Sequence, residues 1–330
     1  MRAIVCTEYG TPDILSLQDI ADPVPGPDQV LVQIHAAGVN FVDSLLICGR
    51  YQIKIPPPFV PGGDLAGSVL EIGSAVSGFA PGDRVLASPG IGAFAQRIAL
   101  HPAALVRIPD AMDFASAAVF LQASATAYFA LHDRGSVQRD ETLLVLGAAG
   151  GTGSAAIQVA KAAGLKVIAA ASSPAKLAAS RELGADFLID YAQQDMRAEL
   201  KRITEGRGVD LVFDPVGGTQ ALLALRSMAE NGRYLVIGFA SGEIPALPFN
   251  LPLLKSCQVV GVDWGGFAGR HPQRAGEVVR EVLALASGGL IKDPPITRYP
   301  LERTGAAIAD LAARRAIGKC VIEIGQGFSG

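Results

Sequence analysis

The chain has few of the residues from which metal sites and disulfide frameworks are built. Its 330 residues include four cysteines and four histidines, and no two cysteines are close in sequence. Neither a Cys-x-x-Cys nor a His-x-x-x-His spacing occurs, so the usual patterns of structural and catalytic zinc sites are missing. We therefore expect metal-free chemistry and reduced cysteines that act as small apolar residues.

Charge of one sign and long apolar runs are also scarce. The net charge is −3 and no basic run occurs, which disfavours nucleic acid as a partner. No apolar run approaches the roughly 20 residues that span a bilayer. The first residues, Met1 to Val5, look like a β-strand rather than a signal peptide, so the expected location is the cytoplasm. At about 150 residues per domain, the length predicts two domains.

A short apolar run that enters a glycine-dense turn is the most informative segment. Leu143–Leu146 predicts a strand, and residues 154–163 predict a helix. Between them, the spacing Ala148-x-Gly150-x-x-Gly153 fits the dinucleotide-binding fingerprint, with alanine in place of the first glycine. Gly150 and Gly151 would let the backbone approach a pyrophosphate, and the helix N-terminus would offer it free N–H groups.

Apolar strands and helices continue to alternate after this turn. The predicted strands cover residues 166–170, 187–189, 209–213, 233–237 and 258–262. The predicted helices cover residues 174–183, 195–204 and 219–228. This alternation predicts an α/β domain with a doubly wound parallel sheet, covered by helices on both faces.

The residues after the second predicted strand bear on the choice of cofactor. An NAD site usually places Asp or Glu about 20 residues past the turn. This chain has no carboxylate there before Glu182, and Ser172, Ser173 and Lys176 can instead donate to a 2′-phosphate. The sequence therefore predicts NADPH rather than NADH. The alternative is that the serines cap the following helix and that Lys176 is an ordinary solvated residue.

The first 120 or so residues differ in kind from the rest. They are rich in Pro, Gly, Val and Ile, and short strands are predicted at residues 30–35, 67–72 and 83–87. Turn signals such as Pro81-Gly82 separate these strands. The pattern predicts a small, strongly bent β-structure.

Motifs that run nearly end to end through the chain carry a family resemblance. They are residues 37–44 (AGVNFVDS), 61–67 (PGGDLAG), 81–85 (PGDRV), 126–128 (TAY), 148–153 (AAGGTG), 213–218 (FDPVGG) and 232–239 (GRYLVIGF). Together they resemble the medium-chain dehydrogenase/reductase superfamily, in its zinc-free quinone oxidoreductase (zeta-crystallin-like) branch. The resemblance is specific for the family and much less specific for the substrate.

The resemblance implies an architecture and an assembly. A Rossmann NADPH-binding domain, residues 123–265, would be inserted into a GroES-like β-rich catalytic domain made of residues 1–122 and 266–330. The active site would lie in the cleft between these domains. A homodimer is also implied, with Rossmann sheets paired edge to edge through the strand at residues 258–262.

The resemblance also bears on metal. Zinc-dependent relatives place a cysteine ligand in the turn where this chain has Val39-Asn40, and a histidine in a Gly-His-Glu turn that here reads Gly62-Gly63-Asp64. The four-cysteine lobe that binds structural zinc is also missing. The resemblance thus supports a metal-free site, and argues against alcohol dehydrogenation that needs a Lewis acid.

Roles for particular residues follow from the resemblance. Asn40 is expected beside the nicotinamide ribose and the substrate. Tyr51 is expected over the cleft, where its hydroxyl would orient the acceptor or relay a proton, or where its ring is only an apolar lid contact. Asp43 is expected to be a structural hydrogen-bonding partner, and Trp264 to flank the pocket or pack in the dimer interface. The other expected cofactor contacts are Thr126, Gly150, Gly151, Thr152, Ser172, Ser173, Lys176, Tyr191, Gly238, Phe239 and Lys319.

Three activities fit these residues. The first is hydride transfer from NADPH to a quinone, and the second is NADPH-dependent reduction of an α,β-unsaturated carbonyl, either an enone or an enoyl-CoA. Such conjugated acceptors suit a metal-free site, because hydrogen bonds can stabilise the charge that develops on a distant oxygen. The third is a non-catalytic NADPH-binding redox sensor.

Overall fold

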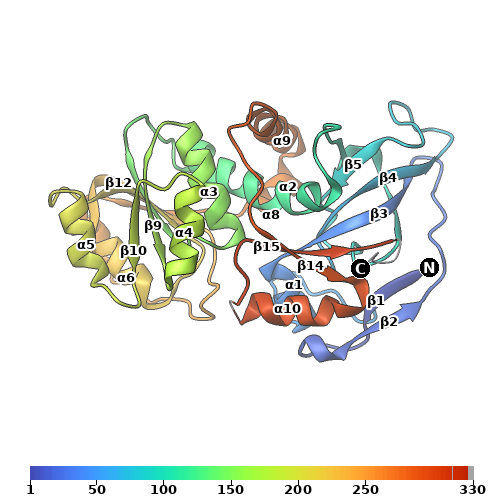
Figure 1. Cartoon of the computed structure of the whole chain (residues 1–330), viewed down its shortest axis with the longest axis horizontal. Helices are drawn as coiled ribbons and strands as arrows, with labels where there is room; N and C mark the ends of the chain where they lie inside the picture. The colour runs from blue at the N-terminus through green and yellow to red at the C-terminus, as the bar shows by residue number, and fades with distance from the viewer. Residues whose placement is uncertain (314, 326–330) are drawn as a thin grey trace. The chain divides into compact units, whose positions relative to one another are not determined.

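The computed structural model describes residues 1–313 and 315–325, which belong to two compact units. One unit contains residues 1–122 together with the chain from Pro295 onward, and the other contains Ala123–Pro294. The second unit is therefore an insertion in the first (Figure 1). The predicted fold class, a doubly wound parallel sheet inserted into a GroES-like β-rich domain, is confirmed.

The inserted unit is built on a parallel sheet. Its strands are β8 (Thr142–Leu146), β9 (Lys166–Ala171), β10 (Phe187–Asp190), β11 (Val209–Asp214), β12 (Met228–Val236) and β13 (Gln258–Gly261). They follow the order β10-β9-β8-β11-β12-β13, and every pairing is parallel. The chain reverses its direction of winding between β8 and β11, the place at which such sheets bind ligands.

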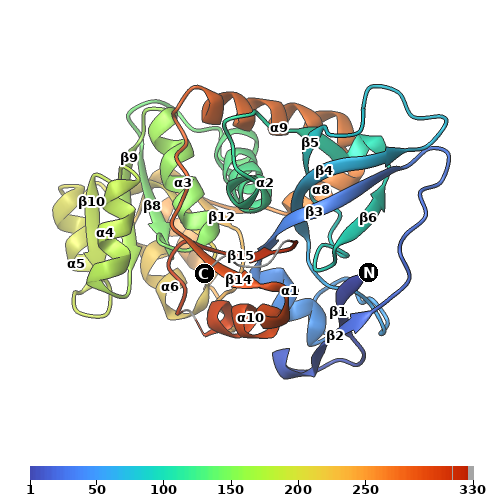
Figure 2. The ribbon, with the colours of Figure 1, turned by 45° about the vertical axis from the view of Figure 1, so that its right-hand side comes forward.

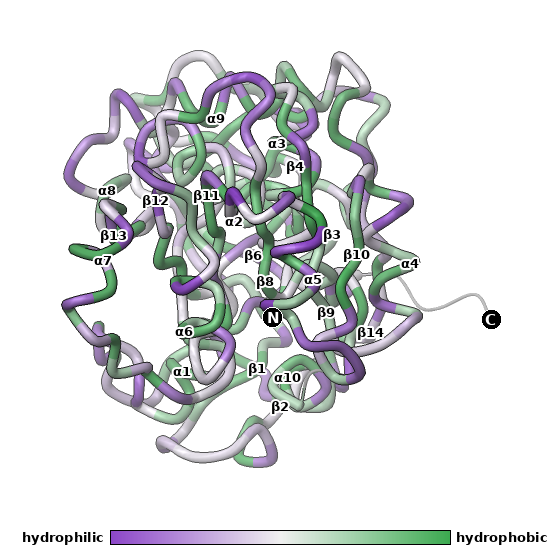
Figure 3. Tube along the Cα trace, turned by 90° about the vertical axis from the view of Figure 1, so that its left-hand side faces the viewer, coloured by the Kyte–Doolittle hydropathy of each residue, from purple (hydrophilic) through white to green (hydrophobic). Residues whose placement is uncertain are grey.

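Helices cover both faces of this sheet. They are α3 (Gly151–Ala162), α4 (Pro174–Glu182), α5 (Met196–Ile203), α6 (Gly218–Arg226), α7 (Asn250–Lys255) and α8 (Trp264–Arg270), and α9 (Pro272–Ser287) packs against α8. Successive side chains of β8 point to opposite faces, so Leu143 and Val145 pack in a core with α3, whereas Leu144 and Leu146 pack with α5 and α6. Because both faces are covered, the strands are apolar along their length, as the green tube of β8 and β10 shows (Figure 3).

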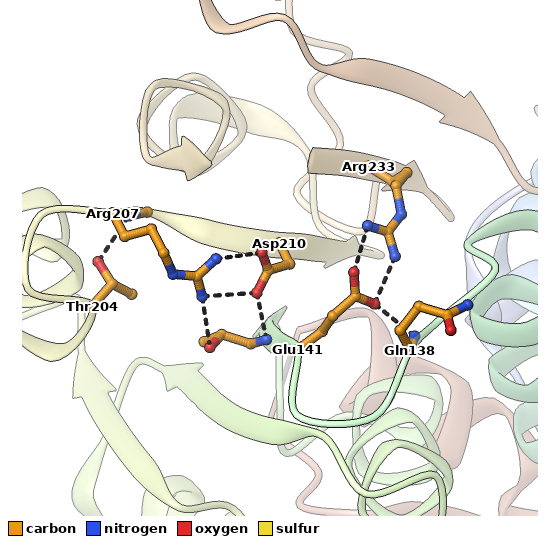
Figure 4. A network of polar contacts seen from close by, with 8 residues as sticks. Gln138, Glu141, Thr204, Arg207, Asp210 and Arg233 are labelled. Atoms are coloured by element: carbon orange, nitrogen blue, oxygen red, sulfur yellow. Dashed lines mark hydrogen bonds and ion pairs between the residues drawn. The ribbon is translucent and has the colours of Figure 1, made fainter. Parts of the chain in front are cut away.

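Ion pairs join the amino ends of the central strands (Figure 4). Arg233 binds both oxygens of Glu141 at 2.8 and 2.7 Å. Arg207 binds both oxygens of Asp210, and Asp210 also accepts a 2.8 Å hydrogen bond from the N–H of Thr142. These contacts tie β8, β11 and β12 together at the edge opposite the glycine-rich turn.

The inserted unit ends later than the sequence pattern suggests. The expected end was residue 265, whereas the compact unit extends to Pro294 and includes α8 and α9. Two contacts account for this: Phe267 of α8 lies 4.4 Å from the Phe129 ring, and Arg274 of α9 makes a two-point ion pair with Asp133. Both partners lie in the π-helical turn η3 (Phe129–Arg134).

A helical stretch from Phe114 to Arg134 precedes β8. It consists of α2 (Phe114–Tyr128) and η3, and by length and composition alone it could cross a membrane. However, 83% of its most apolar window is buried inside the protein, as in a core helix. The expectation that no apolar segment reaches such a length was wrong. Polar residues such as Gln122 and Thr126 interrupt the apolar run, so its full length is not evident in the sequence.

The other unit is mainly antiparallel β-structure. Its strands are β1 (Arg2–Cys6), β2 (Leu15–Asp19), β3 (Val30–Val39), β4 (Asp64–Ile72), β5 (Arg84–Ala87), β6 (Arg97–Leu100), β7 (Leu105–Arg107), β14 (Ile296–Pro300) and β15 (Lys319–Glu323). The main sheet has the order β14-β15-β3-β4-β5-β7, with β6 also paired to β3, while β1 and β2 pair separately. Figure 2 shows α1 (Phe41–Ile47) and α10 (Thr304–Ala312) beside one another below β14 and β15. Short 3-10 turns occur at Pro12–Ile14, Pro102–Ala104 and Leu301–Arg303.

Candidate functional site

The glycine-rich turn lies at the carboxyl edge of the parallel sheet. Gly150 is the N-cap of α3, and Gly151 and Thr152 are its first residues. Since Gly150 has no side chain with which to cap the helix, the first N–H groups of α3 remain available to an anionic ligand. Gly153 cannot carry a side chain, because a Cβ there would lie 2.3 Å from the carbonyl oxygen of Gly147. The turn thus has the close helix–strand packing that the fingerprint requires.

Ser172 and Ser173 follow β9 at the same edge of the sheet. Ala170 of β9 pairs with Leu146 of β8, so the end of β9 lies beside the glycine-rich turn. Ser173 is the N-cap of α4, and its Oγ accepts a 3.5 Å hydrogen bond from the N–H of Lys176. The serine therefore does cap the helix, which is the structural alternative considered for it. This cap uses one Oγ lone pair and leaves the hydroxyl proton available to a phosphate oxygen.

Three other expected cofactor contacts lie after two other strands of the parallel sheet. Tyr191 follows β10, and its N–H bonds to the carbonyl oxygen of Ala171 at 3.1 Å. Gly238 and Phe239 follow β12, and all three residues are partly exposed. The structure therefore gathers Tyr191, Gly238, Phe239 and the glycine-rich turn along one sheet edge. Thr126 is instead 93% buried on α2.

A second group of expected residues meets in the β-rich unit, and strand register explains why. Gly38 of β3 pairs with Asp64 of β4, and Val39 of β3 pairs with Cys320 of β15. Asn40 directly follows Val39 and therefore lies close to the first residues of β4 and β15, which are Asp64 and Lys319. Residues far apart in the chain are brought together by two antiparallel pairings to one strand.

The Asn40 carboxamide is held at both ends. Its Nδ2 donates to Asp64 Oδ2 at 2.7 Å, and its Oδ1 accepts from Lys319 Nζ at 2.7 Å. The other Asp64 oxygen accepts from the exposed hydroxyl of Ser88 at 2.5 Å. The Asn40 backbone N–H donates to Asp43 Oδ2 at 2.7 Å, so Asp43 is the hydrogen-bonding partner expected of it. Of these residues, Asn40, Asp43, Asp64 and Lys319 are all more than nine-tenths buried.

Burial dominates the electrostatics of this cluster. It raises the pKa of the Asp43 carboxyl to about 7, and the N–H of Asn40 only partly offsets this. Burial also raises the pKa of Asp64, against the opposing hydrogen bond from Ser88 and the charge of Lys319. The pKa of the Lys319 ammonium is lowered by burial, although both carboxylates favour its charged form. Two acids and one base thus share a site with little water, where charge is costly unless paired.

Sequence reasoning missed most of this cluster. The hydrogen bond between Lys319 and Asn40 was not predicted, and the expected cofactor contact of Lys319 stays a prediction. Asp64 was named only as part of a turn, and Ser88 was not named at all. Charged residues that begin apolar strands were the one available signal. Within residues 1–313 and 315–325, no group of three or more His, Cys, Asp or Glu side chains is arranged to hold a metal ion.

The two remaining aromatic residues lie in different surroundings. Tyr51 follows α1, is partly exposed, and its backbone N–H bonds to the carbonyl oxygen of Leu45 at 3.2 Å. Trp264 begins α8, and its ring lies 5.5 Å from Phe129 and 6.4 Å from Phe267. Trp264 is therefore part of the aromatic packing of the inserted unit.

Comparison with known proteins agrees with both halves of this architecture. Residues 26–110 match the alcohol dehydrogenase GroES-like domain family, and residues 151–284 match the zinc-binding dehydrogenase family. A quinone oxidoreductase-like protein 2 homolog from Nematostella vectensis is 37% identical over 328 residues, which cover 98% of this chain and 89% of the relative. The chain belongs to the medium-chain dehydrogenase/reductase superfamily. Its relatives place it in the zeta-crystallin-like quinone oxidoreductase branch.

Solved structures similar to this chain include proteins of different kinds. The Escherichia coli quinone oxidoreductase complexed with NADPH has a TM-score of 0.90 and 28% identity, covering 98% of this chain and 100% of that one. The CurF ER cyclopropanase from the curacin A biosynthetic pathway has a TM-score of 0.89 and 27% identity, covering 98% and 99%. The fold is thus shared by a quinone oxidoreductase and a cyclopropanase.

Proposed function

We propose that this oxidoreductase uses NADPH to transfer hydride to a quinone, without a metal ion. The observation that carries the proposal is the Asn40 carboxamide, held at 2.7 Å on both sides at the turn where zinc-dependent relatives have a cysteine ligand. A carboxamide is a poor zinc ligand but a good hydrogen-bond donor to oxygen. The site is therefore suited to an acceptor whose oxygen gains negative charge.

NADPH is the cofactor that the inserted unit fits. The cradle at Gly150 and Gly153 has the backbone approach that a pyrophosphate needs, and no carboxylate follows β9 to repel a 2′-phosphate. The residues that would hold the phosphates are the N–H groups of the first turn of α3, with Ser172, Ser173 and Lys176 at the 2′-phosphate. When bound, NADPH would supply a hydride.

The residues of this chain would position and stabilise rather than react covalently. The carboxamide of Asn40 would donate to the acceptor or the nicotinamide ribose, and hydrogen bonding would stabilise charge on the acceptor oxygen. The hydroxyl of Tyr51 would orient the acceptor or donate a proton. Tyr51→Phe tests the second role, because unchanged turnover would assign protonation to water.

We further propose a homodimer through the β13 edge of the parallel sheet. β13 is the last strand of that sheet, and the region around it exposes several large apolar side chains. They are Ile244, Phe249, Leu253, Leu254 and Val259, of which Phe249 is 93% exposed. A strand edge with exposed apolar neighbours is disfavoured in an isolated chain and is stabilised by pairing.

The acceptor is tested by the initial rate of NADPH oxidation at saturating cofactor. An ortho-quinone is compared with a medium-chain enone and its CoA thioester. We expect the quinone to have the highest kcat/KM by at least tenfold. A higher value for the enone or thioester would make the protein an ene-reductase, an outcome that the cyclopropanase relative makes worth testing. Binding of NADPH without turnover of any acceptor would favour a redox sensor.

A further inference from the structure

The two hydrogen-bond partners of the Asn40 carboxamide determine which way its oxygen and its NH2 group point. Asn40 Oδ1 faces the Lys319 ammonium, which can only donate, and Nδ2 faces the Asp64 carboxylate, which accepts. Reversing the amide would place its NH2 group against the ammonium and its oxygen against the carboxylate. Both hydrogen bonds would become repulsive contacts, so a single orientation is selected.

We propose that Lys319 and Asp64 are positioning residues that lock and polarise the Asn40 carboxamide for its role at the active site. This inference rests on the proposed function and deepens it. It also gives Lys319 a different role from the direct cofactor contact that the family resemblance implies.

The arrangement leaves a defined hydrogen-bonding capacity. An amide group has two N–H donors and two oxygen lone pairs, and Lys319 and Asp64 each use one. One N–H therefore remains for a ligand, because the capping box of α1 places the backbone N–H of Asp43 at the Asn40 side chain. The ammonium draws electron density toward Oδ1, which strengthens the remaining N–H as a donor, whereas the carboxylate fixes the direction in which that N–H points. Such a donor suits an oxygen that becomes negative during hydride transfer.

Burial makes this clamp effective. Lys319 is 95% and Asp64 98% buried, so water cannot easily replace either partner. Ser88, which is exposed, completes the hydrogen bonding of Asp64 and orients its carboxylate toward Asn40. The clamp is therefore formed by the protein before any ligand arrives, which is what preorganised stabilisation requires.

A double-mutant cycle tests the inference. The variants are Lys319→Met, Asn40→Ala and the double variant, with Lys201→Met on the exposed face of α5 as the matched control. We expect Lys319→Met to lower kcat/KM at least tenfold while the Kd for NADPH, measured by fluorescence titration, changes less than twofold. The double variant should be no slower than Asn40→Ala alone, because Lys319 acts only through Asn40. Lys201→Met should have the same kcat/KM and the same Kd for NADPH as the wild type.

Two results would overturn the inference. A Kd for NADPH that is tenfold weaker in the double variant than in Asn40→Ala would identify a direct cofactor contact of Lys319, and multiplied losses of kcat/KM in the double variant would show that Lys319 acts independently of Asn40. Asp64→Asn provides a second route should Lys319→Met fail to fold: it should also lower kcat/KM, without affecting the Kd for NADPH.

A spectroscopic readout separates this inference from the proposed function. The side-chain NH2 signals of Asn40, assigned by their loss in Asn40→Ala, report the two hydrogen bonds without any turnover. In the wild type we expect two well-separated proton shifts, which move together in Lys319→Met. If the wild type reduces no acceptor but shows these shifts, the proposed function fails and the clamp stands. If Lys319→Met leaves the shifts unchanged, the clamp fails whatever the activity.

Discussion

The buried carboxyl of Asp43 should make stability depend on pH. Its pKa is raised from 3.8 to about 7 by burial. A raised pKa means that the fold favours the protonated form, so the stabilising contribution is complete below the unfolded-state pKa of about 3.8 and is lost as the pH rises from there to about 7. Asp43→Asn should remove this dependence, because an asparagine oxygen can still accept the N–H of Asn40 but does not ionise.

The expected size follows from the pKa. A pH of about 5.5 lies about 1.5 units below the pKa of Asp43 in the folded state and well above its pKa in the unfolded state. At about 1.36 kcal/mol per unit, the contribution to stability is about 2 kcal/mol relative to a pH above the folded-state pKa. At about pH 8 the contribution is near zero. The wild type should therefore gain about 2 kcal/mol more than Asp43→Asn in the free energy of unfolding between about pH 8 and about pH 5.5.

Urea unfolding at the two pH values measures this difference, provided that the denaturant slope is the same in both proteins. Asp28→Asn, which changes an exposed aspartate in the same unit, is the control and should follow the wild type. Equal pH dependence in the wild type and in Asp43→Asn would refute the reasoning. It would mean that Asp43 does not change its protonation state between these pH values.

Three other variants test separate features. Gly153→Val should weaken NADPH binding at least tenfold in a fluorescence titration, because a Cβ would lie 2.3 Å from a carbonyl oxygen; normal binding would mean that the helix shifts freely. Ser172→Asp should raise the KM for NADPH at least tenfold and leave that for NADH within threefold, since a carboxylate repels the 2′-phosphate; equal changes would place the phosphate elsewhere. Leu253→Glu with Leu254→Glu should give a monomer by light scattering, and a dimer that persists would exclude the β13 edge.

Much of the inserted unit could be predicted because its signals are local. The apolar run of β8, the glycines that follow it and the start of α3 are contiguous in sequence, and each has the geometry that the fingerprint requires. The strands up to β13 and the helices α4, α5 and α6 were likewise predicted from short apolar patterns, whereas the short helix α7 was not. Their order in the sheet follows from right-handed crossovers between parallel strands.

The Asn40 cluster depends on information that local patterns do not contain. Lys319 and Asn40 are joined by the pairing of β15 with β3, and Asp64 by the pairing of β4 with β3. The place of α8 and α9 was missed for the same reason. It depends on packing of Phe267 against Phe129 and on the ion pair between Arg274 and Asp133, both of which form only in the folded unit.

We propose that this protein is a metal-free reductase that prefers NADPH. The most direct test is the initial rate of quinone reduction by protein dialysed against a chelator, with metal content measured on the same sample and with NADPH compared to NADH. We predict full activity in metal-free protein and a kcat/KM at least tenfold higher with NADPH. Loss of activity on chelation that zinc restores, or an equal or higher kcat/KM with NADH, would contradict the account.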